Sequence, residues 1–521
     1  MKILGINYSA HDVSISYVKD GEIICVLEEE KFRGIKSVDM QWEPPKESLD
    51  YLLKRYDLKK EDFDQVVFSR PTVQNYMTTF NPSKISSYSH HKCHAIGSYL
   101  TSGFSGKCIS LSHDGKGEMS RGKIFLCEDG KYEEIHNQPI ATTASLAGIW
   151  GLSTMILGWR MLKDEGKVVG LAAHGKLDSQ IYTWLKDCIC YDGNLSFSPA
   201  GWESRFWYIF NRQRDRFNDS EFRSNFAFTL EYLSEEIMKD LLTDLSRRYP
   251  EYRKICLSGG LFANVKLNQM INDLDLFDEV FVHPAMGDSG LSLGAALIKA
   301  LEVGDIKSPL KFQNVYLGQD FSKEEWDSEL EKRNEMFEIE DFDLDKISKM
   351  IDEGFVLGVF LGRTEYGPRA LGNRSIVVKP TDKETHERLN SKLKRSEVMP
   401  FAPSVLSEYA EEVFGVKKSS YSAEFMTLCY ETSEEWISKL PAVIQILDRS
   451  ARPQVVRRET NPVYYDIIDS YRKISGIPVV LNTSFNAHGE PINNYPHQVL
   501  RHLEEEIVDF IITEDYIISK K

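Results

Sequence analysis

The amino-terminal part of the chain carries one short pattern twice, and this repeat restricts the fold more than any other feature. In each copy, an apolar strand-like run leads into a His-Asp pair, an alternating run, an Asp-Gly dipeptide and a second alternating run. The repeated residues are His11-Asp12 with Asp20-Gly21, and His113-Asp114 with Asp129-Gly130. Asp-Gly between alternating runs is the signal of a tight hairpin. Two copies in the same order therefore predict two similar α/β units that enclose a cleft.

This duplicated pattern resembles the paired ribonuclease-H-like halves of actin, sugar kinases and chaperone ATPases, where the turn after each first strand faces nucleotide phosphates. A further strand and Gly-Gly loop at residues 255–260 resembles their adenosine-binding element. Glycine lets the backbone approach a ligand closely, and residues four apart share one helical face. The resemblance implies ATP contacts at the following residues: Gly115, Gly117, Gly259, Gly260, Asn264 and Asn268.

A charged stretch after residue 318 predicts a boundary between domain 1–318, which holds the repeat, and domain 319–521. The second part alternates apolar strands with polar helices and reads as a further α/β domain.

The eight cysteines form no CxxC pair, and the net charge of −16 disfavours a broad nucleic-acid surface. No secretion signal is recognisable, and no apolar run approaches the roughly 20 residues that cross a bilayer. We expect a cytoplasmic protein with reduced thiols and no membrane partner.

Two histidines and two aspartates predict a metal site. His90 and His94 are spaced so that a helix would place both imidazoles on one face. Asp114 and Asp288 lie in glycine-flanked turns, where a carboxylate can face a cleft. Two imidazoles and two carboxylates suit a hard or borderline ion. Iron is the first choice, with manganese or magnesium as alternatives, and its task would be to hold ATP phosphates and neutralise developing charge.

The second domain contains a local excess of positive charge. Residues 363–395 hold nine Lys or Arg against four Asp or Glu, within an acidic protein. Arginine offers a planar fork to phosphate or carboxylate oxygens, and glycine-rich turns leave backbone N–H groups free for the same anion. The stretch therefore predicts an anion site.

Longer strings resemble one family over nearly the whole chain, the O-carbamoyltransferases that modify antibiotics and nodulation factors. The strings are HHKCHA, DGKGE, EGKVVGLAAHG, LSGGLFANVKLN and MGDSGLSLGAAL in the first domain, and GRTEYGPRALGNRS, PFAPS and NTSFNAHGEPI in the second. The first domain of that family is similar to the enzyme that transfers threonylcarbamoyl to tRNA. The second is YrdC-like, similar to the synthase of threonylcarbamoyl-adenylate.

The resemblance implies roles for individual residues. The metal ligands would be His90, His94, Asp114 and Asp288, and carbamoyl phosphate would contact Arg363, Arg369, Lys394, Arg395, Ser484 and Asn486. His11 would act as the base, with Lys36 near the developing oxyanion. Three positions depart from the family: the segment around Lys36 is loosened, Asn225 stands where an acid is usual, and Val398-Met399 replace an aromatic-basic pair.

The implied reaction consumes carbamoyl phosphate and ATP with Mg. Carbamate released in the second domain would attack ATP, and the resulting carbamoyl-adenylate would transfer its carbamoyl group to the hydroxyl of a small metabolite or sugar. The same chemistry on a hydroxymethylated pyrimidine nucleotide or DNA stays open, because residues 201–217 interleave aromatic residues with arginines.

Other readings of the sequence also stay open. A non-transferase ATPase of the same superfamily would need no second anion site. The hydrogenase-maturation carbamoyltransferase is opposed by the lack of zinc-finger CxxC pairs. Residues 201–217 can equally form a packed helix or a homodimer surface.

Overall fold

The computed structural model describes residues 1–9, 11–36, 44–70, 79–393, 401–417, 420–445 and 447–521. Lys394, Arg395, Val398 and Met399 lie outside these ranges. The chain forms two compact units, each discussed by itself. The first unit contains Met1–Ile24 and Gln41–Phe312, and the second contains Cys25–Met40 and Gln313–Lys521. The sequence division at residue 318 had assigned residues 25–40 to the first part.

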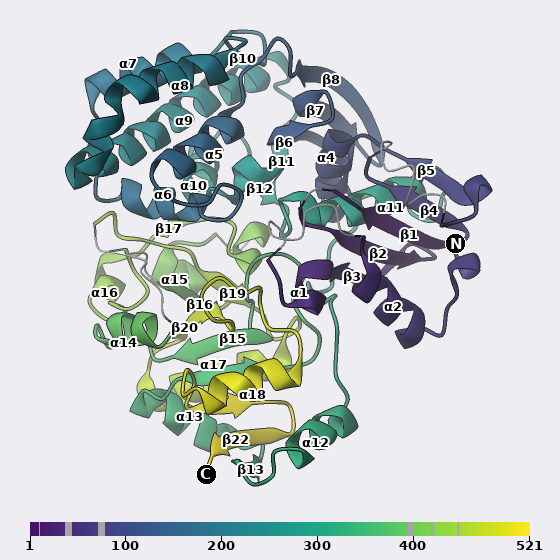
Figure 1. Ribbon diagram of the computed structural model, residues 1–521, viewed down its shortest axis with the longest axis vertical. Coiled ribbons are helices and arrows are strands. Elements are labelled where there is room, and N and C mark those ends of the chain that lie inside the picture. The colour runs from purple at the N-terminus through teal and green to yellow at the C-terminus, as the bar shows by residue number, and fades with distance from the viewer. Residues whose placement is uncertain (10, 37–43, 71–78, 394–400, 418–419, 446) are drawn as a thin grey trace. The chain divides into compact units, whose positions relative to one another are not determined.

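The first unit contains two five-stranded sheets with equivalent strand orders, β3-β2-β1-β4-β5 and β8-β7-β6-β11-β12 (Figure 1). Only the part of β3 up to Ile24 belongs to this unit. In each sheet the strand that comes first in the sequence, β1 or β6, pairs antiparallel with the strand that follows it, β2 or β7. It also pairs parallel with a later strand, β4 or β11. This equivalence confirms the predicted duplication and the α/β class. The bounds are β1 (Lys2–Asn7), β2 (Ser14–Lys19), β3 (Glu22–Glu28), β4 (Gln65–Phe68), β5 (Ile85–Ser87), β6 (Lys107–Gly117), β7 (Ser120–Glu128), β8 (Lys131–Pro139), β11 (Lys254–Ser258) and β12 (Glu279–Val282).

Both predicted Asp-Gly hairpin turns are confirmed. Asp20 and Gly21 have φ of 51° and 84°, and Asp129 and Gly130 have φ of 45° and 83°. Positive φ at both central residues is the requirement of a type I′ turn, which glycine and aspartate tolerate. The first turn also packs closely against another backbone segment, because a Cβ on Gly21 would lie 2.6 Å from the Asp305 carbonyl oxygen.

Helices α4 (His90–Thr101) and α11 (Leu291–Glu302) pack against each other, α4 also on β6 and α11 also on β1. Glycine permits this approach, because a Cβ on Gly97 would lie 2.7 Å from the Gly294 Cα. The amino-terminal ends of both helices carry predicted metal ligands, so this packing helps to assemble the site.

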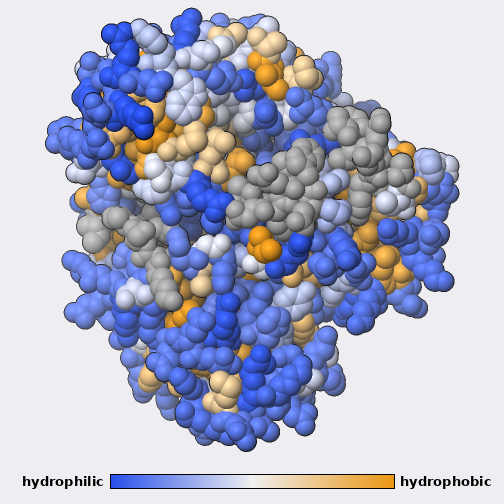
Figure 2. Space-filling model, in the orientation of Figure 1, coloured by the Kyte–Doolittle hydropathy of each residue, from blue (hydrophilic) through white to orange (hydrophobic). Residues whose placement is uncertain are grey.

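The remaining helices of the first unit are α2 (Lys46–Arg55), α5 (Leu146–Ile156), α6 (Glu165–Ala172), α7 (Ser179–Cys188), α8 (Trp202–Gln213), α9 (Ser220–Arg248) and α10 (Val265–Asp273). Apolar side chains gather on part of the surface of this helical region (Figure 2). Met155, Met161 and Leu162 are exposed apolar residues of the first unit. The arginine-aromatic stretch forms α8, whose Trp202 and Phe206 are buried. Its role in stacking an acceptor stays a prediction.

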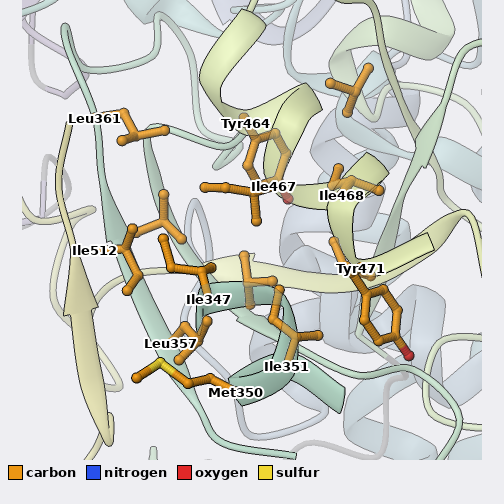
Figure 3. Close-up of a cluster of buried hydrophobic side chains, with 14 of the residues drawn as sticks. Ile347, Met350, Ile351, Leu357, Leu361, Tyr464, Ile467, Ile468, Tyr471 and Ile512 are labelled. Carbon is orange, nitrogen blue, oxygen red and sulfur yellow. The ribbon is translucent and has the colours of Figure 1, made fainter. Parts of the chain in front are cut away.

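The second unit contains an eight-stranded mixed sheet in the order β13-β22-β21-β14-β15-β20-β16-β19. Helices α13 and α17 pack together, and their apolar faces form a core with the sheet (Figure 3). The bounds are α1 (Glu29–Arg33), α12 (Lys323–Glu331), β13 (Phe337–Asp341), α13 (Leu344–Glu353), β14 (Leu357–Phe360), β15 (Arg374–Val378), α14 (Thr385–Lys392), β16 (Ala402–Leu406), α15 (Ala410–Phe414), β17 (Tyr430–Glu431), α16 (Glu434–Ile437), β18 (Ser450–Ala451), β19 (Gln454–Val456), α17 (Pro462–Ser475), β20 (Val479–Ser484), α18 (Pro496–Glu504), β21 (Phe510–Ile512) and β22 (Tyr516–Lys520). Its likeness to YrdC stays a prediction.

The cysteines in the structure are free, and all but Cys190 are buried. No helix in the described part of the chain combines the length and the apolar character needed to span a bilayer.

Candidate metal centre and anion site

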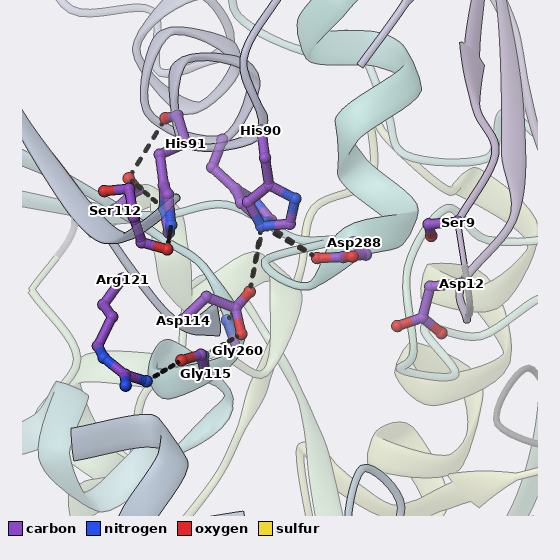
Figure 4. A network of polar contacts seen from close by, with 12 residues as sticks. Ser9, Asp12, His90, His91, Ser112, Asp114, Gly115, Arg121, Gly260 and Asp288 are labelled. Carbon is purple, nitrogen blue, oxygen red and sulfur yellow. Dashed lines mark hydrogen bonds and ion pairs between the residues drawn. The ribbon is translucent and has the colours of Figure 1, made fainter. Parts of the chain in front are cut away.

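The four predicted metal ligands come together in the first unit (Figure 4). His90 and His94 lie in the first two turns of α4, Asp114 near the end of β6, and Asp288 at the start of the turn that leads into α11. One ligand atom from each residue lies within 4.8 Å of every other. Three segments far apart in the sequence therefore deliver two nitrogens and two oxygens to one point.

The geometry of this cluster fits a bound cation. The His94 Nε2 lies 3.2 Å from Asp288 Oδ1 and 3.4 Å from Asp114 Oδ2. The His90 Nε2 lies 3.5 Å and 3.7 Å from the same two oxygens. That nitrogen is buried without a hydrogen-bond partner in the described chain. A buried polar atom without a partner is costly, and a metal ion would satisfy it.

Burial and opposite charges set the protonation of the cluster. Burial lowers the pKa of His94, but its hydrogen bonds to Asp114 and Asp288 outweigh this and raise the pKa to about 8. Burial alone would raise the pKa of Asp288, yet His90 and His94 hold it well below its usual range. Burial would likewise raise the pKa of Asp114, but His90 and His94 hold it well below its usual range as well. Both carboxylates are therefore ionised at neutral pH, as a metal ligand must be.

Arg70, which the sequence analysis missed, touches two of the ligands. Its Nη2 lies 2.9 Å from His90 Nδ1 and 2.9 Å from Asp288 Oδ2. The residue follows β4, which is parallel to β1, at the carboxyl end where ligand-binding residues of such sheets collect. No sequence motif surrounds Arg70, so only its place after a predicted strand could have indicated a role in the site.

His11 lies beside the cluster. Its Nδ1 lies 3.1 Å from Asp12 Oδ2, and its Nε2 lies 4.0 Å from Asp288 Oδ2. Burial lowers the pKa of His11, but the hydrogen bond to Asp12 and the charge of Asp288 raise it overall to about 10. Lys36 belongs to the second unit, where its Nζ lies 3.9 Å from Glu30. The catalytic roles of His11 and Lys36 stay predictions.

The predicted ATP-binding glycines surround the metal ligands. The backbone N–H groups of Gly115 and Gly260 donate to the Asp114 carboxylate, at 2.6 Å and 3.1 Å. A Cβ on Gly117 would lie 2.2 Å from His90 Cδ2, and one on Gly259 would lie 2.3 Å from the His113 carbonyl oxygen. These glycines permit close packing around the site, whereas a Cβ on Gly115 would meet no atom within 4 Å.

The two asparagines predicted to bind ATP are held by internal hydrogen bonds. Asn264 caps α10 by accepting from the Lys266 and Leu267 N–H groups, and its amide donates to Glu231. Asn268 is fully buried and donates to the Phe262 carbonyl oxygen at 2.8 Å. Contacts of either side chain with a nucleotide stay predictions.

The second unit contains two partly buried arginines, near enough for the charge of one to act on the other, without acidic partners in the described ranges. Arg369 lies in the loop before β15, and Arg452 lies between β18 and β19. Burial and the neighbouring Arg452 charge lower the pKa of Arg369. The Nε atoms of both are buried without partners, and neither guanidinium has a hydrogen bond or ion pair within the described ranges. Two such cations are a candidate site for an anion. The sequence analysis missed Arg452, which lies outside the Arg-rich stretch.

The other residues predicted for this site have varied surroundings. Arg363 donates to the carbonyl oxygens of Leu317 and Gly318, at 2.7 Å and 3.0 Å. Ser484 ends β20 and pairs with Ser375 of β15, and the Asn486 amide donates to nearby backbone carbonyls. Lys394 and Arg395 lie outside the described residues. The donor-site roles of all five stay predictions.

Comparison with known proteins gives consistent matches. The family described as carbamoyltransferase N-terminus matches residues 2–82 and 72–297, and that described as carbamoyltransferase C-terminus matches residues 348–520. Nodulation protein NolNO of Sinorhizobium fredii is 30% identical, over 99% of this chain and 80% of its own. An uncharacterized protein of Methanocaldococcus jannaschii is 31% identical over 99% of both chains.

Solved structures resemble the chain at low similarity. The activator of 2-hydroxyisocaproyl-CoA dehydratase from Clostridium difficile, with bound ADPNP, aligns with a TM-score of 0.37 and 14% identity, over 58% of this chain and 97% of its own. Full-length HypF in a phosphate- and nucleotide-bound form aligns with a TM-score of 0.34 and 16% identity, over 58% and 56%.

Proposed function

Because the chain belongs to the carbamoyltransferase family and is a carbamoyltransferase enzyme, we propose that it carries out ATP-dependent O-carbamoylation with carbamoyl phosphate as donor. The observation that carries this proposal is the coexistence of a four-ligand cation site in the first unit and a paired-arginine anion site in the second. A transferase that activates its donor with ATP needs both kinds of site. A simple ATPase needs only the first.

The donor site is proposed at Arg369 and Arg452. Their guanidinium groups would bind the phosphate of carbamoyl phosphate by charge-assisted hydrogen bonds, which a pair of unpartnered arginines can form. Water would release inorganic phosphate there and leave carbamate. Carbamate decomposes in water, so the active site must shield it from solvent until its next reaction.

The activation step is proposed at the histidine-aspartate cluster. His90, His94, Asp114 and Asp288 would hold a divalent or trivalent ion, iron, manganese or magnesium, which would neutralise charge on the ATP phosphates. A carbamate oxygen would form a bond to the α-phosphorus of ATP, and the bond to pyrophosphate would break. The product is carbamoyl-adenylate.

In the transfer step, the oxygen of the acceptor hydroxyl would form a bond to the carbamoyl carbon, and AMP would leave. His11 is the proposed base that removes the hydroxyl proton, since it lies 4.0 Å from a ligand of the cation site. Without a bound cation its pKa is about 10 and the imidazole is protonated, so this role requires the positive charge of the bound cation beside Asp288 to lower that pKa. Lys36 would stabilise charge on the carbamoyl oxygen. The proposed acceptor is a small metabolite or sugar, and a hydroxymethylated pyrimidine nucleotide or DNA is the second candidate because of the arginine-aromatic helix α8.

Isotope exchange tests the activation step without knowledge of the acceptor. We expect carbamoyl phosphate to make the enzyme exchange labelled pyrophosphate into ATP, and expect His94→Ala to exchange weakly. His497→Ala, which changes an exposed histidine outside the quoted family strings, is the matched control. Full exchange after complete metal removal would contradict the assignment of the cation site.

A panel of alcohols and hydroxymethyl nucleotides, with labelled carbamoyl phosphate, would then identify the acceptor.

A further inference from the structure

A buried ion pair at the start of α1 contacts the loop that carries Arg369. The Lys31 Nζ lies 2.6 Å from Glu28 Oε2, and the side chains are only 5% and 6% exposed. Both residues belong to the segment Cys25–Met40, which is part of the second unit although it comes from the amino-terminal region of the sequence. Neither residue has a role in the reaction described above.

The pair holds one side of the loop through its backbone. The Lys31 ammonium donates to the carbonyl oxygens of Glu365 and Gly367, at 2.7 Å and 3.1 Å. The Glu28 carboxylate accepts from the Gly367 N–H at 2.8 Å. Both polar backbone groups of Gly367 are thus bound by the pair, two residues before Arg369. Gly367 has a φ of 101°, which suits glycine and few other residues.

The other side of the loop is held as firmly. The Glu365 Oε1 accepts from the backbone N–H groups of Leu371, Asn373 and Arg374, at 2.8–2.9 Å. The Gln454 amide donates to the Leu371 carbonyl oxygen at 2.7 Å. The tip between these two anchors contains Pro368, Arg369 and Ala370, so the anchors decide where the Arg369 side chain begins.

The cost of burying the pair suggests a role other than stability. Two charges lose their hydration when they are buried, and well-packed apolar residues of similar size often replace such a pair without loss of stability. What apolar side chains cannot replace is the set of directed hydrogen bonds to Gly367. An anion site with two arginines depends on such placement, because charge-assisted hydrogen bonds need a defined distance and direction. In catalysis, a displacement of about 1 Å can lower the rate on the order of a hundredfold.

We propose that Glu28 and Lys31 are positioning residues of the anion site. They fix the loop in the conformation that presents Arg369 beside Arg452 to a phosphate group. The inference rests on the proposed function only in naming carbamoyl phosphate as the natural anion. Binding of inorganic phosphate tests the anion site without that assumption.

Calorimetric titration with inorganic phosphate tests this inference. We expect the double variant Glu28→Gln/Lys31→Met, which removes both charges together, to raise the Kd for phosphate about tenfold. We expect its Kd for ATP to stay unchanged. The matched control is Glu435→Gln/Lys439→Met, which removes an exposed ion pair of the same unit and should leave both affinities unchanged.

A double-mutant cycle separates positioning from general damage to the fold. If the pair acts through Arg369, the double variant should weaken phosphate binding no further when Arg369→Ala is also present. Equal weakening in both backgrounds, or no weakening in either, would overturn the inference. If the double variant does not fold, Lys31→Arg takes its place, since it keeps the charge but changes the hydrogen-bond geometry. Failure of the wild-type protein to bind phosphate would instead overturn the proposed donor site.

Discussion

Arg70 and His90 share a hydrogen bond whose direction is fixed by chemistry. The atoms Arg70 Nη2 and His90 Nδ1 lie 2.9 Å apart, and a guanidinium can only donate, so Nδ1 accepts. In a neutral imidazole the proton then resides on Nε2, the nitrogen that faces Asp114 and Asp288. An imidazole that ligates a metal through Nε2 carries its proton on Nδ1. Metal ligation through His90 Nε2 therefore requires the hydrogen bond from Arg70 to break.

This competition predicts the effect of Arg70→Met on metal affinity. Removal of the competing cation and of its hydrogen bond should tighten Mn²⁺ binding about tenfold or more, a gain of ~1.4 kcal/mol. The measurement is a Mn²⁺ titration followed by electron paramagnetic resonance. Arg253→Met, which removes an exposed ion pair of the same unit, should not change the affinity. Weaker Mn²⁺ binding in Arg70→Met would mean that Arg70 supports the metal site instead.

A pair of glycine substitutions separates the metal site from the predicted phosphate loop. Gly117→Ala should displace the His90 ring, because its Cβ would lie 2.2 Å from His90 Cδ2, and should reduce both Mn²⁺ affinity and the melting temperature. Gly115→Ala has open space around its Cβ and should preserve both. If Gly115 faces ATP phosphates, its variant should weaken ATP binding alone. Equal Mn²⁺ affinity in the two variants would contradict this reading of the packing.

The sequence predicted those features that short-range patterns determine. The Asp-Gly turns at residues 20–21 and 129–130 specify two hairpins, and their repetition specifies two sheets with equivalent strand orders. The His90–His94 spacing specifies one helical face, and the glycine-flanked Asp114 and Asp288 lie close to it. Each of these predictions needed only local geometry and the alignment of two repeats.

Features that depend on long-range packing could not be predicted in the same way. Arg70 and Arg452 lie in no sequence motif. Each belongs to its site because of how strands and loops distant in the sequence pack together. The association of residues 25–40 with the second unit depends on contacts with residues more than 300 positions away, such as the one between Lys31 and Glu365. Asn264 has the helical position expected of a ligand-binding residue, but its amide bonds a buried Glu231 that no pattern indicates.

Arg452 should be required for use of the donor. Arg452→Met removes one of the two guanidinium groups whose buried Nε atoms have no partner in the described ranges, so release of inorganic phosphate from carbamoyl phosphate should fall at least as strongly as in Arg369→Ala. ATP binding should survive in both variants, since the arginines lie in the other unit. The control Arg458→Met changes an exposed arginine and should keep full activity. An equal loss of ATP affinity would show that the two sites were assigned to the wrong units.

Glu231 should make stability depend on pH. Burial and the neighbouring Glu235 raise the pKa of Glu231 to about 8, above the ordinary 4.5 of an unfolded chain. Between those values the folded state binds the proton more tightly, so the stabilising contribution is complete below about pH 4.5 and is lost as the pH rises to 8. Glu231→Gln removes this dependence and keeps an acceptor for Asn264. Relative to wild type, it should gain roughly 3–4 kcal/mol between pH 5 and pH 8 in denaturant unfolding. A constant difference would refute the raised pKa.

The last prediction separates the transfer of the carbamoyl group from its activation. A base that acts only when the acceptor hydroxyl attacks contributes to transfer and not to adenylate formation, and such proton transfer is typically worth roughly 10²–10⁴-fold. His11→Ala should therefore lower transfer by that factor and leave carbamoyl-phosphate-dependent pyrophosphate exchange intact. Lys36→Ala should behave alike if Lys36 stabilises the carbamoyl oxygen, and should weaken exchange if it contacts ATP. Equal loss of exchange and transfer in His11→Ala would assign His11 to the metal site, where its Nε2 lies 4.0 Å from Asp288, and would end its assignment as the base.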